Sequence, residues 1–273
     1  MESSKVRKPA VAGQFYPGTA QGLKREIESL IDKIAQKQDI VACMLPHAGY
    51  TYSGRVAAET VSHINIKEKV VLLGPNHTGY GTAFSIMTEG AWQTPLGEVK
   101  IDSALARKIL SGSKYLQDDC LAHMYEHSLE VEIPFLQYFK SDFQIVPIAF
   151  LSDDLAALKE VGIEVAEAIK DLSLENSVMI VASSDMTHYE SQEEASRKDN
   201  EAIKAILELN EDKLMERIRS LSISMCGYAP AVAMIAAAKE LGAKNAKLIK
   251  YQTSGEVTGD TDSVVGYAGM IIY

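Results

Sequence analysis

Short apolar runs alternate with amphipathic segments along nearly the whole chain. A short apolar run bounded by turn residues is typical of a buried strand, and apolar residues at intervals of three and four are typical of a helix. Strands and helices that alternate in this way form a mostly parallel sheet covered by helices. We therefore predict an α/β fold with a mostly parallel central sheet flanked by helices. Strands are expected at 40–46, 69–74, 143–151, from 178 onward, at 247–252 and at 264–272, with a strand, a turn and a strand over 82–101.

The amphipathic segments between these runs have the spacing of helices. Residues 22–36 show it most clearly, with apolar side chains at Leu23, Ile27, Leu30, Ile31 and Ile34. Asp102 is expected to cap a helix through Leu110, and Asp153 or Asp154 to cap a longer one. Other helices are expected at 54–63, 130–139, 192–208, 211–220 and 227–241. Because no internal repeat or low-complexity linker interrupts the pattern, we expect a single domain over residues 1–273.

Three histidines follow three of the predicted strands. His47 comes after the run at 40–46, His77 after the run at 69–74, and His188 after the run that begins at 178. In an open α/β sheet, ligands bind outside the carboxyl ends of the strands, so these histidines could meet at one edge. His47 and His77 lie 77 − 47 = 30 positions apart, about one strand–helix–strand unit, and neighbouring strands would let their rings share a ligand. A histidine of this kind on its own is more typical of a local hydrogen bond.

Composition and charge exclude several classes of protein. Hydrophobic residues make up 47% of the 273 residues, as expected for a folded globular chain. The 37 acidic and 27 basic residues give a net charge of −10, which opposes binding to nucleic acid or to an anionic membrane. The longest uncharged apolar stretch, 222–238, contains Pro230 and is shorter than the roughly 20 residues of a membrane span. We predict that this stretch forms a buried helix.

The cysteines and the amino-terminal residues indicate a compartment. Cys43, Cys120 and Cys226 are an odd number without short regular spacing, which argues against a disulfide framework and for a reducing environment. The basic residues Lys5 and Arg7 are not followed by the apolar segment of a secretory signal. We expect a cytoplasmic protein.

Asp185 and Cys226 also have the chemistry of site residues. Asp185 precedes His188 by three positions, and a carboxylate beside an imidazole can leave it poised as a general acid or base. An N-cap for the following helix is an equally good interpretation of Asp185. Cys226 directly precedes the predicted helix at 227–241, where the backbone dipole favours a thiolate that can bind a metal or act as a nucleophile. The alternative of an inert buried cysteine fits Cys43, inside a strand, better.

A second motif suggests another kind of site. His123-Met-Tyr-Glu-His127 matches the H-x-x-E-H pattern of one group of zinc peptidases. That chemistry needs both histidines on one face of a helix, whereas the clear helix signal begins only near Ser128 or Leu129. We interpret the polar, glycine-containing segment at 253–263 as a connecting loop between strands rather than as a phosphate loop, because it lacks the Gly-Lys-Ser/Thr signature.

Seven short blocks of sequence together resemble the Memo family. They are RKPAVAGQFYP at 7–17, PHAGYTYSG at 46–54, GPNH at 74–77, TPLG at 94–97, EHSLE at 126–130, SDMTH at 184–188 and MCG at 225–227. The blocks extend over most of the chain, so the resemblance is specific. It implies a fold similar to that of the class III extradiol dioxygenases, which cleave catechol rings with iron held by two histidines and a glutamate. Microbial members of the family often accompany a radical-SAM protein and an AMMECR-type protein, so a functional association with such proteins is expected.

The resemblance also implies roles for individual residues. His47 and His77 would be the two metal-binding imidazoles, and Cys226 would take the third position. His188 would be the catalytic base with Asp185 beside it, and His127 would line the same pocket. We expect substrate contacts from three further residues, Tyr50, Arg55 and Glu126. Because a thiolate is softer than a carboxylate, this set favours iron or copper, with zinc as a further option, and makes ordinary ring cleavage a poor fit.

Two functions follow as hypotheses. The first is a metal-dependent redox protein or enzyme that acts on a small, phenolic or similar molecule in the pocket at the strand ends. The second is a non-catalytic module with a vestigial active site that binds a peptide or phosphotyrosine, as the animal relatives are described to do. The chain has no arginine cluster suited to phosphate, and Arg55 is the only candidate near the His47 turn.

Overall fold

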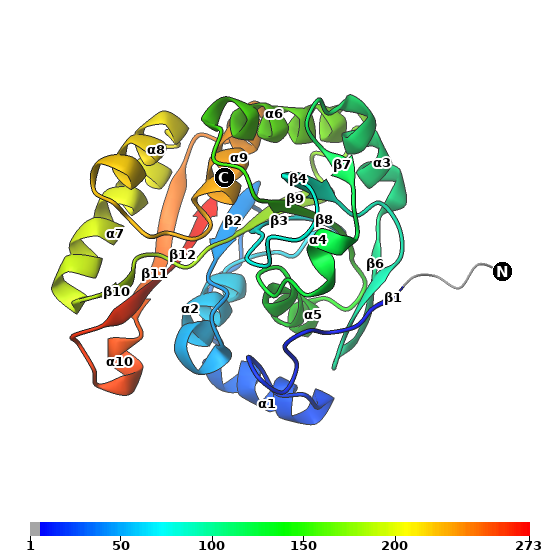
Figure 1. Ribbon diagram of the computed structural model, residues 1–273. Helices are drawn as coiled ribbons and strands as arrows, with labels where there is room; N and C mark the ends of the chain where they lie inside the picture. The colour runs from blue at the N-terminus through cyan, green and yellow to red at the C-terminus, as the bar shows by residue number, and fades with distance from the viewer. Residues whose placement is uncertain (1–5) are drawn as a thin grey trace.

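The computed structural model describes residues 6–273, so Lys5 lies outside the described part (Figure 1). Within this range twelve strands form one sheet. The strands are β1 Val6–Arg7, β2 Ala42–Leu45, β3 Lys69–Pro75, β4 Phe84–Ile86, β5 Ala91–Thr94, β6 Gly97–Ile101, β7 Gln117–Asp118, β8 Gln144–Phe150, β9 Val178–Ser183, β10 His188–Glu190, β11 Ala246–Thr253 and β12 Val264–Ile272. The helices are α1 Ala20–Leu30, α2 Tyr50–Ser62, α3 Ser103–Gly112, α4 Leu121–Met124, α5 Ile133–Phe139, α6 Leu155–Asp171, α7 Gln192–Leu207, α8 Glu211–Ser220, α9 Tyr228–Glu240 and α10 Gly255–Thr258.

The centre of the sheet is parallel, as predicted. Strand β3 pairs in parallel with β8 on one side and with β9 on the other, and β9 pairs in parallel with β2. These four strands are almost wholly buried, because they are built from continuous apolar runs. Strand β12 then adds antiparallel to β2, with β11 and β10 beyond it. The fold is a mixed α/β sheet in which most central pairings are parallel.

The order of the strands does not meet the condition of neighbouring strands considered above for His47 and His77. The strands that precede His47 and His77 are not neighbours, because β9 lies between β2 and β3. The connection through α2 leaves room for a strand that comes much later in the sequence. His47 and His77 therefore flank the end of β9, which carries Ser183 and leads to Asp185.

Helices cover both faces of the sheet (Figure 1). Helix α9 packs on β3 and β9 and is covered in turn by α6 and α8, while α2 lies on the other face with α1 and α5. Helix α9 is rich in alanine and buried on every side, as predicted for this apolar stretch. In the described part of the chain, no helix combines the length and the apolar character needed to cross a membrane.

Helix α1 is shorter than predicted. It begins after Thr19, whose side chain accepts a hydrogen bond from the amide of Gly22, and it ends at Leu30 rather than at residue 36. Ile31 is extended, the carboxylate of Asp32 accepts from the amide of Ile34, and Ile34 is 90% exposed. A side chain that bonds its own backbone competes with the helix, and here it outweighs the apolar spacing.

Other observed boundaries differ from the predicted ones by fewer residues. Helix α2 begins at Tyr50 rather than at residue 54, the segment at 82–101 forms three strands, and the helix expected from residue 130 opens with a 3₁₀ turn at Glu130–Glu132. The loop expected at 253–263 contains the short helix α10. The caps at Asp102 and Asp154 are present, each accepting two backbone amides.

Candidate functional site

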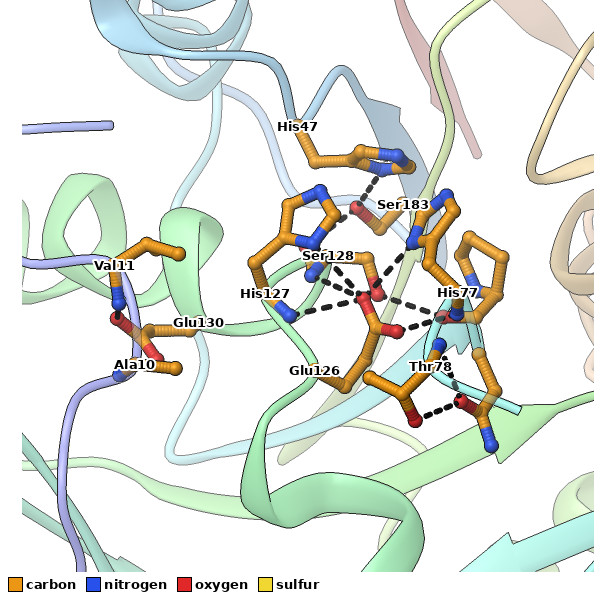
Figure 2. Close-up of polar contacts among 12 residues, drawn as sticks. Ala10, Val11, His47, His77, Thr78, Glu126, His127, Ser128, Glu130 and Ser183 are labelled. Atoms are coloured by element: carbon orange, nitrogen blue, oxygen red, sulfur yellow. Dashed lines mark hydrogen bonds and ion pairs between the residues drawn. The ribbon is translucent and has the colours of Figure 1, made fainter. Parts of the chain in front are cut away.

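His47 lies at the centre of the site and is almost completely buried. Its Nε2 is 3.2 Å from Sγ of Cys226. Its Nδ1 is 2.8 Å from Oγ of Ser183, a contact drawn in Figure 2. The backbone amide of His47 donates to Asp185 at 2.8 Å. Burial, followed by the neighbouring His77 and His127, lowers the pKa of His47 well below its usual range, so the ring is neutral.

Glu126 holds His77 beside it. The Nδ1 of His77 is 3.0 Å from Glu126, and the same carboxylate accepts the backbone amides of His77, His127 and Ser128 (Figure 2). Burial raises the pKa of Glu126, but the hydrogen bond and charge of His77, with the Ser128 amide and the charge of His127, outweigh burial and lower it to about 2. Glu126 is therefore an ionised carboxylate that fixes the orientation of His77. Its side chain, which the sequence led us to expect in contact with a substrate, is buried.

Cys226 completes a group of three potential ligands. The ligand atoms of His47, His77 and Cys226 all lie within 4.8 Å of one another. The amide of Asp185 donates to Sγ of Cys226 at 3.3 Å. Burial, and next the charge of Asp185, raise the pKa of the Cys226 thiol, so the helix start alone does not produce the thiolate that we expected. A bound cation supplies the opposite effect, because a thiol deprotonates when it coordinates a metal.

His127 belongs to the same cluster. Its ring stacks on that of His77 with the centroids 4.8 Å apart, and it meets the ring of His47 at 5.5 Å and that of Phe15 at 4.9 Å. His77, Glu126 and His127 form a second group of potential ligands that shares one histidine with the first. Burial lowers the pKa of His127, although the charge of Glu126 opposes this.

The sequence led us to expect Asp185 and His188 in contact. Both lie in the site, but each is hydrogen-bonded to other groups. Asp185 accepts from the backbone amides of His47 and Ala48, whereas Nδ1 of His188 lies 2.9 Å from the carbonyl oxygen of Ser224. His188 opens the separate strand β10 rather than ending β9. Burial raises the pKa of Asp185 to about 6, against the hydrogen bonds that it accepts. Asp185 therefore positions the His47 turn.

A cavity of about 670 Å³ opens over the cluster. Its lining includes the histidines at positions 47, 77, 127 and 188, together with Asp185 and the tyrosines Tyr52, Tyr189 and Tyr267. Residues from the segment at 254–265 also line the cavity. No lysine or arginine is among its described lining residues.

Two of the predicted substrate contacts lie away from this cavity. Tyr50 is in the core, where its hydroxyl donates to the carbonyl of Val131 and its ring stacks on Phe135. Arg55 pairs with Glu59 along the exposed face of α2. Tyr52 lines the cavity in place of Tyr50, because two steps along a helix turn a side chain by about 200°. The residue at which α2 begins decides which tyrosine faces the cavity, and the apolar pattern of the sequence did not predict that residue.

The geometry does not fit the peptidase motif. Helix α4 ends at Met124, so His123 and His127 do not share a helix. His123 is fully buried against Trp92. Burial lowers its pKa to about 4, and the charge of Arg7 acts in the same direction.

Sequence reasoning missed Ser183 and Glu132, which lie behind His47. Ser183 directly precedes the block SDMTH at 184–188, which the sequence analysis singled out, and this position could have pointed to it as a site residue.

Comparisons with known proteins agree with this fold and with the sequence resemblance. A family model described as Memo-like protein matches residues 7–271. A MEMO1 family protein of Methanococcoides burtonii is 45% identical over 98% of this chain and 100% of its own length, and one of Aquifex aeolicus is 45% identical over 98% and 99%. An uncharacterized protein, JW3007, of Escherichia coli K12 shares the fold at a TM-score of 0.57 and 16% identity, over 85% of this chain and 99% of that one. The chain belongs to the Memo-like family.

Proposed function

We infer that this protein binds a redox metal, iron or copper, through His47, His77 and Cys226 and acts on a small molecule in the cavity above them. The observation that carries this proposal is the convergence of three ligand atoms within 4.8 Å. Atoms bound to one ion at 2.0 to 2.3 Å are separated by roughly 3 to 4 Å, so small adjustments would bring them together.

The surroundings of the ligands support a metal. Each histidine has its Nδ1 held by an oxygen, Ser183 for His47 and Glu126 for His77, so Nε2 is the nitrogen left for a metal. Such outer partners are typical of metal-binding histidines. The Nε2 of His47 already lies 3.2 Å from the third proposed ligand, Sγ of Cys226. Two imidazoles and a thiolate favour iron or copper over the hard cations, and zinc is the alternative. When bound, the metal would supply electron transfer and Lewis acidity.

The cavity indicates what kind of molecule the site accepts. Its aromatic residues suit a flat ring, and its ionisable lining consists of histidines, tyrosines and acids. His188 and His127 line the cavity, where either can take or give a proton at a hydroxyl of the bound molecule. A phosphotyrosine is disfavoured, because none of the described lining residues carries a fixed positive charge. We place this activity in the cytoplasm, where reducing conditions keep Cys226 a thiol.

Metal analysis of the purified protein tests the proposal. We expect close to one iron or copper per chain in the wild type, and a loss of most of it in His47→Ala and in Cys226→Ser. His63→Ala and Cys120→Ser are the matched controls for the histidine and the cysteine. His63 directly follows α2, where its Nδ1 contacts the carbonyl oxygen of Glu59, and Cys120 is exposed. Unchanged metal content in both site variants would overturn the proposal.

A further inference from the structure

The hydroxyl of Ser183 contacts three groups behind His47. Its Oγ lies 2.7 Å from the carbonyl oxygen of Ser128, 2.8 Å from Nδ1 of His47 and 2.9 Å from Oε1 of Glu132. All four residues are buried. Figure 2 shows Ser183 between His47 and the segment that carries Ser128.

Counting protons assigns a direction to each of these contacts. A hydroxyl has one proton and two lone pairs. The carbonyl of Ser128 can only accept, so the proton of Ser183 goes to it. The two lone pairs must then accept from the other partners, so His47 donates from Nδ1 and Glu132 donates from Oε1. Glu132 can donate only as a neutral carboxylic acid.

The surroundings of Glu132 agree with a neutral acid. Its side chain is fully buried, and no described residue forms an ion pair with it or a hydrogen bond to its second oxygen, Oε2. The titratable groups near it are Cys43, Tyr50, Asp185 and, across the Ser183 hydroxyl, His47. None of them is a cation, because burial lowers the pKa of His47 and leaves its ring neutral. Burying an unpaired charge is costly, and burial raises the pKa of Glu132 well above its usual range.

We propose that Glu132 is a positioning residue: as a buried neutral acid it occupies one lone pair of Ser183, so that His47 must carry its proton on Nδ1 and present an unprotonated Nε2 towards Cys226. This inference rests on the proposed function for its purpose, because a metal binds the unprotonated nitrogen. It requires no metal to be tested.

The test uses the full chain without metal and reads two spectra. Glu132→Gln keeps a donor in the same shape, because its amide N–H can replace the acid O–H, whereas Glu132→Met and Ser183→Ala remove the constraint. In ¹⁵N-histidine-labelled protein, we expect His47 to be the Nδ1–H tautomer in the wild type and in Glu132→Gln. In Glu132→Met and Ser183→Ala, we expect a mixture of both tautomers, because the Nδ1 proton is no longer required. Mere loss of packing would not be rescued by glutamine.

Difference infrared spectra report the proton on Glu132 itself. The wild type minus Glu132→Gln should show the carbonyl stretch of a protonated acid. Glu164 is the matched control, since this buried carboxylate accepts from the amide of Lys114 and from the hydroxyl of Ser113, and its difference spectrum should show carboxylate bands. Carboxylate bands from Glu132, or a His47 proton on Nε2 in the wild type, would overturn the inference.

A metal titration separates this inference from the proposed function. If the site binds metal, Ser183→Ala should weaken binding by about 10- to 100-fold and Glu132→Gln should leave it within about twofold of wild type. A wild type that shows the expected protons but takes up no metal would refute the proposed function and leave the proton arrangement standing. Metal binding equally tight in wild type and Ser183→Ala would refute the positioning role.

Discussion

At the scale of single residues, Glu126 organises more of the site than any histidine does. Its carboxylate accepts hydrogen bonds from the backbone amides of His77, His127 and Ser128 and contacts Nδ1 of the His77 ring. The pKa of about 2 lies below the ordinary value of 4.5, so ionised Glu126 stabilises the fold. This contribution is fully present above pH 4.5 and is lost as the pH falls towards 2.

Glu126→Gln should therefore destabilise the protein in a pH-dependent way. A shift of 4.5 − 2 = 2.5 pKa units corresponds to about 3 kcal/mol at pH 7. Urea unfolding of wild type and variant should show this difference at pH 7 and a smaller one at pH 3. Glu98→Gln, at an exposed position of β6, should change the free energy of unfolding by less than about 0.5 kcal/mol. An equal loss at both pH values for Glu126→Gln would contradict the assignment.

The residue types in the sequence predicted the position of the histidine cluster better than they predicted the contacts of each side chain. His47, His77 and His188 do line one cavity. His47 and His77 follow the ends of parallel strands, which share an edge of the sheet, and His188 lies shortly after the end of β9 at the start of β10. The hydrogen-bond partner of Asp185 could not be predicted, since its distance from His188 along the chain does not fix the direction of its carboxylate. The same holds for Glu126, whose partners come from a loop without a periodic pattern.

At the scale of elements, the sequence predicted most strands and long helices but not their order. Apolar periodicity identifies β2, β3 and β9 separately, yet it carries no information on which strand lies between the others. Asp154 correctly marks the start of α6, because a cap is a local interaction. The predicted end of α1 was wrong, because a local and a long-range hydrogen bond of Asp32 together terminate the helix. Its carboxylate accepts from the amide of Ile34, and its own amide donates to Ser62 in α2, a contact that helical spacing does not reveal.

Helices α6 and α9 approach each other through a glycine. A Cβ at Gly162 would lie 2.2 Å from the carbonyl oxygen of Ala233. Gly162→Ala should therefore cost about 1–3 kcal/mol by forcing the helices apart, with little change in metal content. Gly112, the last residue of α3, has nothing within 4 Å of its Cβ position, and Gly112→Ala should be neutral or stabilising by up to about 1 kcal/mol. Thermal unfolding of the two variants compares them directly, and an unaffected Gly162→Ala would disprove the close contact.

At the scale of the whole molecule, the amino-terminal segment connects the loop that carries Glu126 and His127 to strand β1 of the sheet. The buried guanidinium of Arg7 pairs with Glu130 and donates to the carbonyl oxygens of His123 and Glu126. Glu130 in turn accepts from the amides of Ala10 and Val11. The loop that positions His77 and His127 thus depends on residues more than a hundred positions earlier in the chain.

Removing the Arg7–Glu130 ion pair should lower the free energy of unfolding. Arg7→Leu leaves Glu130 without its cation, and losing one partner of a buried pair costs about 3–5 kcal/mol. Arg107→Leu breaks an exposed pair with Glu89 and should cost less than about 0.5 kcal/mol. Chemical denaturation measures both. A similar, small loss in the two variants would show that the Arg7 pair contributes no more than a surface pair.

The contact between His47 and Cys226 has a consequence for the timing of assembly. The two residues are 179 positions apart, and β2, which leads to His47, is flanked on one side by β12 at the carboxyl end of the chain. A chain synthesised as far as Asp185 contains His47 and His77 but lacks both Cys226 and that flanking strand. These two long-range contacts can form only when that part of the chain has been synthesised. The metal proposed for this site would therefore bind to a nearly complete chain, after most of synthesis, and would not guide the folding of the earlier part.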